Sequence, residues 1–450
     1  MPKKKTALTI EERLQQALVP AEEQPYEVPE NWVWVRLGAV CYASKEKSND
    51  FSNEIKYIGL EHLEKDKGIV GFSSADKVKS TKNAFQEGQI LYGRLRPYLN
   101  KHDIASFSGV CSTDILVFEA SVLVANVLVD KFFNLPFFIE YVVANSKGIN
   151  LPRVSEKTIL NTTFPLPPLS EQQRIVERIE ELFAKLDEAK ERLHEVADSF
   201  AVRKAAILHK AFTGELTKQW RLENGVSDES WEEKLLGDVC TVNPKKIDAK
   251  NLDDNLEVSF VPMAAVSDVL GEIVNHEVKN LQDVRTGFTN FSKGDVIFAK
   301  ITPCMENGKS AIVGPLVNDI GYGSTEFYVL RCKEELNNKY LYHMVRNTTF
   351  RAEAKAVMTG AVGQQRVPKT FLQEYQLLLP TLPEQHEIVR LIDDLLAREH
   401  KAQQATEQAL ASIDLMKKSI LARAFRGELG TNKASEASAL ELLKQVLAEN

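Results

Sequence analysis

A long internal repeat is the feature that most constrains how this 450-residue chain can fold. PLSEQQRIVERI (168–179) matches TLPEQHEIVRLI (381–392), and KAFTGEL (210–216) matches RAFRGEL (423–429), both at an offset of 213 residues. Because the offset is the same for both pairs, the segments between them align without a gap. Upstream, GVCSTDILV (109–117) matches GYGSTEFYV (321–329) and extends the repeat. The pattern predicts two copies of one unit, each a mixed domain followed by a helix.

Each copy changes its character once along its length. Short β-rich runs separated by turn residues predict strands at 89–92 and 115–118 in the first copy, and at 296–299 and 327–330 in the second. The proline-rich segments FPLPPLS (164–170) and LLPTLPE (378–384) follow and favour an extended backbone. Ser170 with Gln173, and Thr381 with Glu384, have the spacing of a capping box. This spacing predicts that a helix starts at each segment.

Both predicted helices carry apolar residues at a period of about 3.5, which is typical of coiled coils. The first stripe contains Ile175, Ile179, Leu182, Leu186, Ala189, Leu193, Val196 and Phe200. The second contains Ile388, Ile392, Leu395, Ala402, Ala409, Ile413, Met416 and Ile420, with Glu399 and Thr406 interrupting it. Ordinary core helices are the alternative, but each helix has the other as its most evident partner. We therefore expect an α+β protein in which two mixed α/β domains are separated by two long antiparallel coiled-coil helices, with a pseudo-twofold repeat.

The predicted organisation has six parts. They are an N-terminal helical segment (1–24), a first mixed domain (25–167), a central long helix (168–217), a second mixed domain (218–380), a C-terminal long helix (381–429) and a helical tail (430–450). Within the two ends, residues 9–19 and 436–448 have the pattern of amphipathic helices.

Composition excludes several classes of protein. The longest apolar run is far shorter than the roughly 18 residues that a membrane span needs. The start of the chain does not resemble a secretory signal, so we expect a cytoplasmic protein. The five cysteines form no C-x-x-C pair and the histidines are scattered, so neither a disulfide framework nor a metal site is expected. The net charge of −7 counts against nucleic-acid binding.

No catalytic motif is evident. The tetrapeptide NGKS (307–310) resembles the end of a P-loop, but Pro303 occupies the position of the required first glycine. Asp295 and Lys300 on a strand could indicate a nuclease, yet the matched residues of the first copy are Gln89 and Arg94. We therefore expect Asp295 to be a turn or solvated aspartate and the chain to be non-catalytic.

The paired motifs P-L-P-P-L-S-E-Q-Q-R-I-V and A-F-x-G-E-L resemble the type I restriction–modification specificity subunit family over residues 25–430. The resemblance implies that each mixed domain reads one half of a split, asymmetric sequence in double-stranded DNA. It also implies that the helices space the domains and bind two methyltransferase subunits, which restriction (motor) subunits then join. S-adenosylmethionine, ATP and Mg would bind those partners, and this chain would hold no cofactor or metal and would not contact a membrane.

Side chains suited to DNA recognition cluster at two places in each domain. Arginine can bind guanine bidentately, asparagine or glutamine can bind adenine, and lysine can bind phosphate. The candidates are Arg94, Arg96, Tyr98, Asn100, Lys101, Asn150 and Arg153 in the first domain, and Lys300, Thr302, Asn307, Lys309, Gln364, Gln365 and Arg366 in the second. Ser112-Thr113 and Ser324-Thr325 are shared by both copies, so we expect structural caps there.

Two other functions remain open. The chain could be a structural dimerisation protein with degenerate DNA-binding domains, which predicts no sequence-selective DNA binding. It could also be the recognition half of a fused methyltransferase–nuclease, although its complete two-copy design counts against this.

Overall fold

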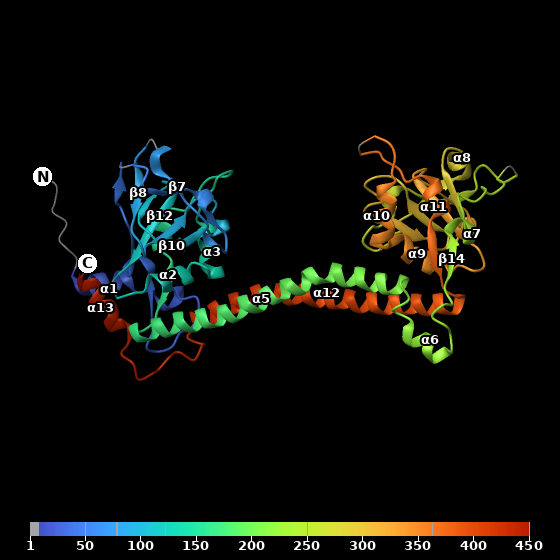
Figure 1. Ribbon diagram of the computed structural model, residues 1–450. Helices are drawn as coiled ribbons and strands as arrows, with labels where there is room; N and C mark the ends of the chain where they lie inside the picture. The colour runs from blue at the N-terminus through green and yellow to red at the C-terminus, as the bar shows by residue number, and fades with distance from the viewer. Residues whose placement is uncertain are drawn as a thin grey trace. The chain divides into compact units, whose positions relative to one another are not determined.

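The computed structural model describes residues 9–49, 51–77, 80–121, 123–249, 251–361 and 363–449, which form two compact units (Figure 1). Unit 1 runs to Leu193 and resumes at Gln408, and unit 2 contains His194–Glu407. Each unit therefore holds one mixed domain together with a part of each long helix.

The mixed domain of unit 1 contains two sheets and a ribbon. The antiparallel sheet has the order β10-β9-β12-β2 (His102–Ile104, Ile90–Gly93, Ile115–Ala120 and Cys41–Ala43). The second sheet has the order β3-β8-β11-β4-β7 (Lys47–Ser48, Lys82–Phe85, Gly109–Cys111, Lys56–Ile58 and Ser73–Ser74), in which β11 and β4 are parallel. A hairpin joins β5 (Leu63–Glu64) to β6 (Gly68–Ile69), and a ribbon pairs β1 (Val33–Arg36) with β13 (Thr163–Leu166).

Strands β9 and β12 form the centre of unit 1 because both of their faces are buried. Tyr92 and Phe118 on one face pack against helices α2 (Asn126–Phe132) and α3 (Pro136–Ala144). Leu91 and Val117 on the other face pack against the second sheet. The alternation of side chains along each strand thus fills two core layers. Helix α4 (Glu156–Leu160) precedes β13.

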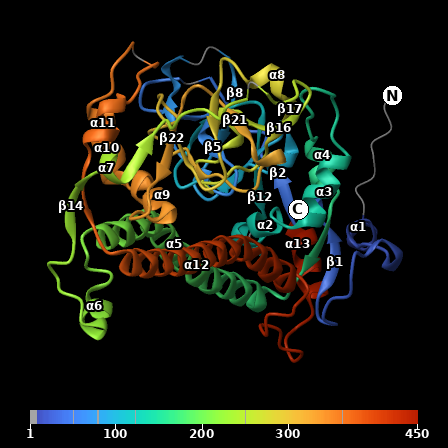
Figure 2. The ribbon, with the colours of Figure 1, turned by 90° about the vertical axis from the view of Figure 1, so that its right-hand side faces the viewer.

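Unit 2 repeats this architecture. Its first sheet has the order β15-β22-β19-β20 (Cys240–Val242, Phe327–Cys332, Val296–Ala299 and Ser310–Ile312), and its second has the order β17-β16-β21-β18 (Glu277–Asn280, Glu257–Val261, Gly321–Gly323 and Thr289–Phe291). A ribbon pairs β14 (Glu232–Leu235) with β23 (Gln376–Leu379). The helices are α7 (Leu236–Val239), α8 (Leu281–Val284), α9 (Asn338–Arg346), α10 (Thr348–Ala356) and α11 (Lys369–Glu374). Helix α9 packs on β22 and α10, and α11 packs on α7 and β15 (Figure 2). Single 3-10 turns η1 to η7 occupy Ala21–Glu23, Leu37–Ala39, Leu60–His62, Ala75–Lys77, Pro97–Leu99, Met263–Ala265 and Val317–Asp319.

The four strands that the sequence predicts are confirmed as β9, β12, β19 and β22. The proline-rich segments also have the expected extended backbone, since each contributes the last strand of its domain, β13 or β23.

The two long helices, α5 (Leu169–Phe212) and α12 (Leu382–Ala424), pack against each other in antiparallel directions (Figure 1). In unit 1, Lys190 Nζ lies 3.0 Å from a carboxylate oxygen of Asp414. In unit 2, Arg203 Nε lies 3.0 Å from a carboxylate oxygen of Glu399. Because the partner number falls as the α5 number rises, the prediction of antiparallel helices is confirmed.

The predicted apolar stripes are buried unevenly. The first two positions of each stripe lie in the cores of the mixed domains (Ile175, Ile179, Ile388 and Ile392). Phe200 and Ile413 are buried, whereas Leu182, Leu186, Leu193, Leu395 and Ile420 are half-buried. The expectation of a continuous buried stripe is wrong at Ala189, Val196, Ala402 and Met416, which are exposed. A straight α-helix drifts by about 20° per heptad relative to a 3.5-residue period. Because a pair of helices also covers only a narrow face of each helix, these stripe positions turn away from the partner helix.

Neither predicted capping box forms. Helix α5 begins at Leu169, so Ser170 lies inside the helix, and Gln173 donates a hydrogen bond to Glu177. The Glu384 carboxylate is buried and accepts hydrogen bonds from Thr217 and Arg221, both at 2.7 Å. The spacing predicts that the Glu384 carboxylate binds the start of its own helix, but it binds residues that are distant in the sequence.

The matched residue in unit 1, Glu171, is buried in a similar socket. Its carboxylate accepts hydrogen bonds from Trp32 Nε1 at 2.7 Å, Asn432 Nδ2 at 2.8 Å and Thr431 Oγ1 at 3.0 Å. Asn432 follows the exit of α12, so Glu171 ties the start of one long helix to the segment after the other. In unit 2, Trp231 Nε1 and Glu384 Oε2 are buried without a hydrogen-bond partner in the described part of the chain.

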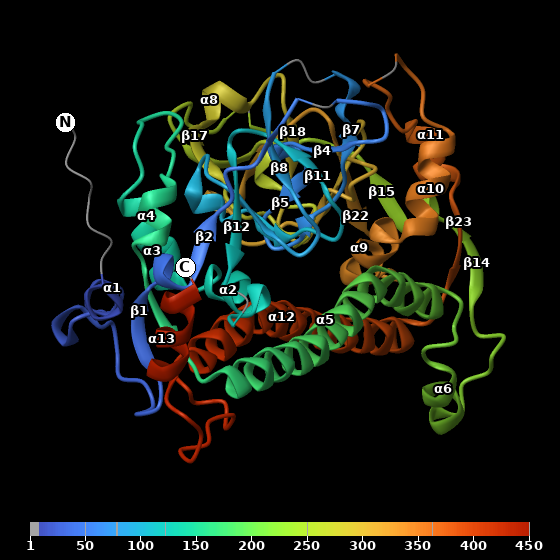
Figure 3. The same ribbon diagram turned by 90° about the vertical axis from the view of Figure 1, so that its left-hand side faces the viewer.

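The end segments 9–19 and 436–448 contain α1 (Ile10–Ala17) and most of α13 (Ala439–Glu449), as their amphipathic pattern predicts. The two helices pack against each other in unit 1, where Arg13 Nη1 donates to the Leu447 carbonyl at 3.2 Å (Figure 3). Helix α6 (Lys218–Asn224) follows α5 in unit 2.

Candidate nucleic-acid interface

In unit 1, the first cluster of candidate residues lies on a tight turn between β9 and β10. Gly93 N donates to the Lys101 carbonyl at 2.8 Å, which closes the turn around η5. Arg96 and Asn100 flank η5 with φ of 53° and 43°, in the left-handed region that residues with a side chain rarely adopt. Two such residues within five positions indicate that the surrounding structure fixes the shape of the turn.

The second cluster lies on a loop that packs directly against this turn. The loop Lys147–Arg153 is closed by reciprocal backbone hydrogen bonds of 2.9 and 2.8 Å between its two ends. Arg96 N donates to the Pro152 carbonyl at 2.7 Å, and Val154 N donates to the Arg94 carbonyl at 3.0 Å. Residues that are more than fifty positions apart in the sequence thus form one surface.

Unit 2 brings its two clusters together through the same backbone contacts. Thr302 N donates to the Gln365 carbonyl at 3.0 Å, and Val367 N donates to the Lys300 carbonyl at 2.9 Å. Thr359 and Arg366 close the second loop with hydrogen bonds of 3.0 and 2.8 Å. We call the turn and the loop together the reading surface of each unit: 94–101 with 147–153 in unit 1, and 300–309 with 359–361 and 363–366 in unit 2.

An arginine fixes each loop to a neighbouring carboxylate. Arg153 donates to Asp114 through Nε at 3.0 Å and Nη2 at 3.3 Å. Arg366 donates to Glu326 through Nε at 2.9 Å and Nη2 at 2.8 Å, and these hydrogen bonds hold the pKa of Glu326 below its ordinary value. Both guanidinium groups are thereby committed to a carboxylate, so their structural role is to position the loops.

The sequence reasoning missed the two carboxylates Asp114 and Glu326. Their signal lies in the repeat, because an acidic residue follows Ser-Thr in both GVCSTDILV and GYGSTEFYV. Ser112 Oγ and Ser324 Oγ accept hydrogen bonds from the amides of Asp114 and Glu326 at 3.3 and 3.2 Å. The shared serines thus cap the turns that present the carboxylates.

Asn100 must be withdrawn as a candidate for base recognition, because it is only 7% exposed. Its Nδ2 donates to the Phe133 carbonyl at 3.0 Å and to Asn134 Oδ1 at 3.3 Å. His102 continues this buried network with Nδ1 lying 2.6 Å from Asp130 Oδ1. Burial alone would raise the pKa of Asp130, but the charge and hydrogen bond of His102 outweigh it and hold that pKa below its ordinary value.

Several candidate side chains have protein partners and are only partly available. Lys101 Nζ donates to the Leu60 carbonyl at 3.0 Å, and Lys309 Nζ donates to the Met263 carbonyl at 3.3 Å. Thr302 Oγ1 accepts a hydrogen bond from Gln365 N at 3.1 Å. Arg153 and Arg366 are exposed but bound to their carboxylates. The other exposed candidates are Arg96, Tyr98 and Asn150 in unit 1, and Asn307 and Gln364 in unit 2, while Arg94 and Lys300 are half-buried.

Asp295 closes a turn, as one alternative of the prediction had it, since its N donates to the Ser292 carbonyl at 3.1 Å. The other alternative, a solvated aspartate, is wrong, because Asp295 is 2% exposed. Arg331 donates to both of its carboxylate oxygens at 2.7 Å. In unit 1 the matched residues are Gln89 and Glu119, and Gln89 Nε2 donates a hydrogen bond to the Glu119 carboxylate at 2.7 Å. This pair therefore has one neutral and one charged member. Asp295 is therefore part of a structural ion pair within the sheet, and no nuclease role follows from it.

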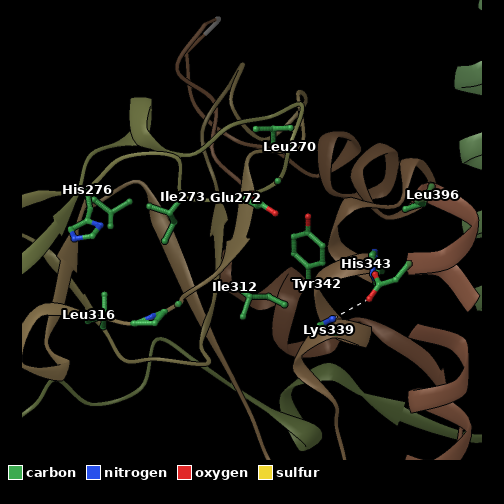
Figure 4. Close-up of a pocket in the computed structure, with 15 residues that line it drawn as sticks. Leu270, Glu272, Ile273, His276, Ile312, Leu316, Lys339, Tyr342, His343 and Leu396 are labelled. Atoms are coloured by element: carbon green, nitrogen blue, oxygen red, sulfur yellow. Dashed lines mark hydrogen bonds and ion pairs between the residues drawn. The ribbon is translucent and has the colours of Figure 1, made fainter. Parts of the chain in front are cut away.

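Unit 2 also contains a pocket of about 730 Å³ (Figure 4), which apolar and polar side chains line between the segment 270–276, α9 and α12. Asp393 of α12 lies 3.0 Å from both His343 Nε2 and Lys339 Nζ. The hydrogen bond from His343, with a further contribution from Lys339, holds the pKa of Asp393 below its ordinary value. These polar groups therefore hold α9 against the long helix.

The chain belongs to the type I restriction modification DNA specificity domain family, whose model matches residues 29–197 and 228–410. The two matched regions correspond to the two copies of the repeat. In the part of the chain that the structure describes, no helix is long and apolar enough to cross a membrane. Within the same residues, no group of three or more potential ligands is placed to hold a metal ion.

Individual relatives support this membership. The chain is 33% identical over 263 residues to the specificity subunit of the type I restriction enzyme EcoEI from Escherichia coli, covering 49% of this chain and 44% of that protein. It thus spans about half the length of that relative. It is also 26% identical over 346 residues to the EcoBI specificity subunit of Escherichia coli, covering 70% of each chain. The fold is similar to that of the HsdS subunit from Thermoanaerobacter tengcongensis, with a TM-score of 0.66, 22% identity and coverage of 90% of this chain and 99% of that one.

Proposed function

We propose that this chain is the DNA-recognition subunit of a type I restriction–modification complex and binds a bipartite, asymmetric target with one half-site for each mixed domain. The observation that carries this proposal is the recurrence of the reading surface. The same backbone contacts and the Arg153 and Arg366 clamps build it in both units. The remaining exposed side chains differ: Arg96, Tyr98 and Asn150 in unit 1, and Asn307 and Gln364 in unit 2. A shared frame with different exposed groups suits two half-sites of different sequence.

The partners follow from the family and from the names of the relatives, which are specificity subunits of type I restriction enzymes. We expect double-stranded DNA, two methyltransferase subunits and restriction subunits as partners. S-adenosylmethionine, ATP and Mg would bind to those subunits, and this chain would act in the cytoplasm without a catalytic centre of its own. We retain 25–167 and 218–380 as the recognition domains, and 168–217 and 381–429 as spacer helices.

The decisive experiment is a methylation map of DNA from cells that express this chain together with its methyltransferase. We expect one motif of two short half-sites separated by a fixed unspecified gap, with methylated adenine in each half. If both proteins are soluble and associated but no new methylated motif appears, the alternative of a structural dimerisation protein is favoured. In that case every DNA contact proposed here would have to be abandoned.

A further inference from the structure

The tip of the second loop of unit 1 exposes two aliphatic side chains to solvent. Ile149 is 100% exposed and Leu151 is 45% exposed, and Asn150 lies between them. Single exposed hydrophobic residues are common on protein surfaces, so exposure by itself assigns no role. The construction of the loop, its place on the reading surface and its difference from the matched loop together suggest one.

The loop has a fixed shape although its tip is exposed. Its base is closed by the hydrogen bonds between Lys147 and Arg153, and Arg153 is anchored to Asp114. Gly148 has φ of +105°, and a Cβ atom there would lie 3.0 Å from the Leu151 carbonyl oxygen. Only glycine fits this position without strain. A tip presented on such a closed base loses little conformational entropy when it binds a partner.

The tip is continuous with the turn that carries the exposed arginine. Pro152, next to Leu151, accepts the hydrogen bond from Arg96 N at 2.7 Å. Tyr98 on the same turn is 50% exposed. The aliphatic side chains therefore belong to the same reading surface as the groups proposed to contact DNA, which favours DNA over a protein as their partner.

The matched loop of unit 2 has the same closure but a different tip. Gly360, with φ of +124°, occupies the place of Gly148. The residues that follow are Ala361, Val362, Gly363 and Gln364, one more than Ile149, Asn150 and Leu151 in unit 1, and Val362 lies outside the described residues. Gln364 precedes the residue that contacts the turn, as Leu151 does in unit 1. The frame thus recurs in both units, whereas Gln364 stands where unit 1 has Leu151 and the tip is one residue longer, as expected at positions that determine the sequence of each half-site.

We propose that Ile149 and Leu151 contact the 5-methyl group of a thymine in the major groove while the Asn150 amide binds the edge of an adenine. This inference rests on the proposed function and makes the loop tip a reader of A·T pairs in the half-site of the first domain. The thymine methyl is the apolar group that base edges present in the major groove, and asparagine can bind adenine N6 and N7 together. Burial of one methyl group corresponds to about a fourfold change in affinity.

The test uses the full chain assembled with its methyltransferase and duplexes that carry the mapped target. Each thymine of both half-sites is replaced singly by deoxyuridine, which lacks only the 5-methyl group, and the dissociation constant is measured. We expect one replacement to weaken binding by the wild-type complex about fourfold. The double variant Ile149→Ala, Leu151→Ala should bind both duplexes equally, whereas the control Val70→Ala, a half-exposed residue elsewhere in unit 1, should keep the fourfold difference.

The outcomes separate this inference from the proposed function. If the wild-type complex binds its target but responds to no deoxyuridine, or if the double variant keeps the fourfold difference, the thymine contact is overturned and DNA recognition still stands. If the double variant no longer associates with the methyltransferase, the tip docks a protein and the inference is wrong. If the wild-type chain directs no methylation at all, the proposed function itself fails.

Discussion

Replacing Arg96 by alanine and by glycine separates backbone strain from DNA contact at a single position. Arg96 has φ of 53° and ψ of 63°. A residue with a side chain in this region costs roughly 1–3 kcal/mol, which alanine retains and glycine largely relieves. Glycine in turn adds about 0.5–1 kcal/mol of chain entropy to the unfolded state. We therefore expect Arg96→Gly to be about 1 kcal/mol more stable than Arg96→Ala.

Thermal unfolding measures this difference, which corresponds to about 2–4 °C in Tm for a domain of roughly 150–250 residues. Glu195, an exposed residue within α5, provides the matched control, because glycine in a helix interior is less stable than alanine by about 1 kcal/mol. The order of the two variants should thus be opposite at Glu195 and Arg96. An Arg96→Gly protein that is less stable than Arg96→Ala would refute the left-handed turn.

The same two variants test the DNA contact independently of stability. Both remove the guanidinium group, so both should weaken binding of targets that carry the first half-site by roughly 1–3 kcal/mol. Equal losses would assign the effect to the side chain, because the backbone differs between the two proteins. Unchanged affinity in both variants would remove Arg96 from the reading surface and leave its strain without a functional reason.

Three further predictions concern the scaffold. Trp32→Phe should destabilise unit 1 by about 1–3 kcal/mol because buried Glu171 loses a donor, whereas Trp231→Phe should cost less because Trp231 Nε1 has no partner among the described residues; equal changes in Tm would contradict this. Asp393 has a lowered pKa in the folded chain, so its contribution to stability is present above the unfolded pKa of about 3.9 and is lost as pH falls through the folded value. Asp393→Asn should therefore lose less stability on acidification, and an unchanged acid unfolding curve would contradict the assignment. Four residues inserted near Ala197, with four more near Thr406, should lengthen the recognised gap by about two base pairs at most or abolish binding, while an unchanged methylation motif would refute the spacer role.

The repeat and the hydrophobic periodicities were enough to predict the elements of the fold. Two mixed domains, four central strands and two long antiparallel helices follow from patterns that are local or that recur at a fixed offset. Positions such as Ile175 and Ile388 could be assigned to a buried face because helical period and burial are directly linked. The two clusters of candidate DNA contacts were also found, although their packing into one surface depends on backbone hydrogen bonds between distant segments.

The wrong predictions share a physical cause: the polar side chains concerned bind residues that are distant in the sequence, where local patterns had suggested solvent or nearby backbone groups. Asn100 has the composition of a base reader, but it is buried against the Phe133 carbonyl. Glu384 has the spacing of a capping residue, but it accepts hydrogen bonds from Thr217 and Arg221. Asp295 lies at a turn but is not solvated, because it is buried and pairs with Arg331. In each case the partner is more than thirty residues away, where single-sequence patterns carry no information.

The matched positions show how one frame can serve two different recognition tasks. The pairs Gln89–Glu119 and Asp295–Arg331 connect equivalent positions of the two units. The carboxylate belongs to the second residue in unit 1 and to the first residue in unit 2, so the contact is kept although the residue types differ. The clamps Arg153–Asp114 and Arg366–Glu326 fix equivalent loops in the same way. Because these contacts carry the loop geometry, the residues at the loop tips are free to differ without loss of the fold. Changes of specificity should therefore be tolerated at the tips and not at the clamps, and loops exchanged between the units should be transplanted with their carboxylate partners.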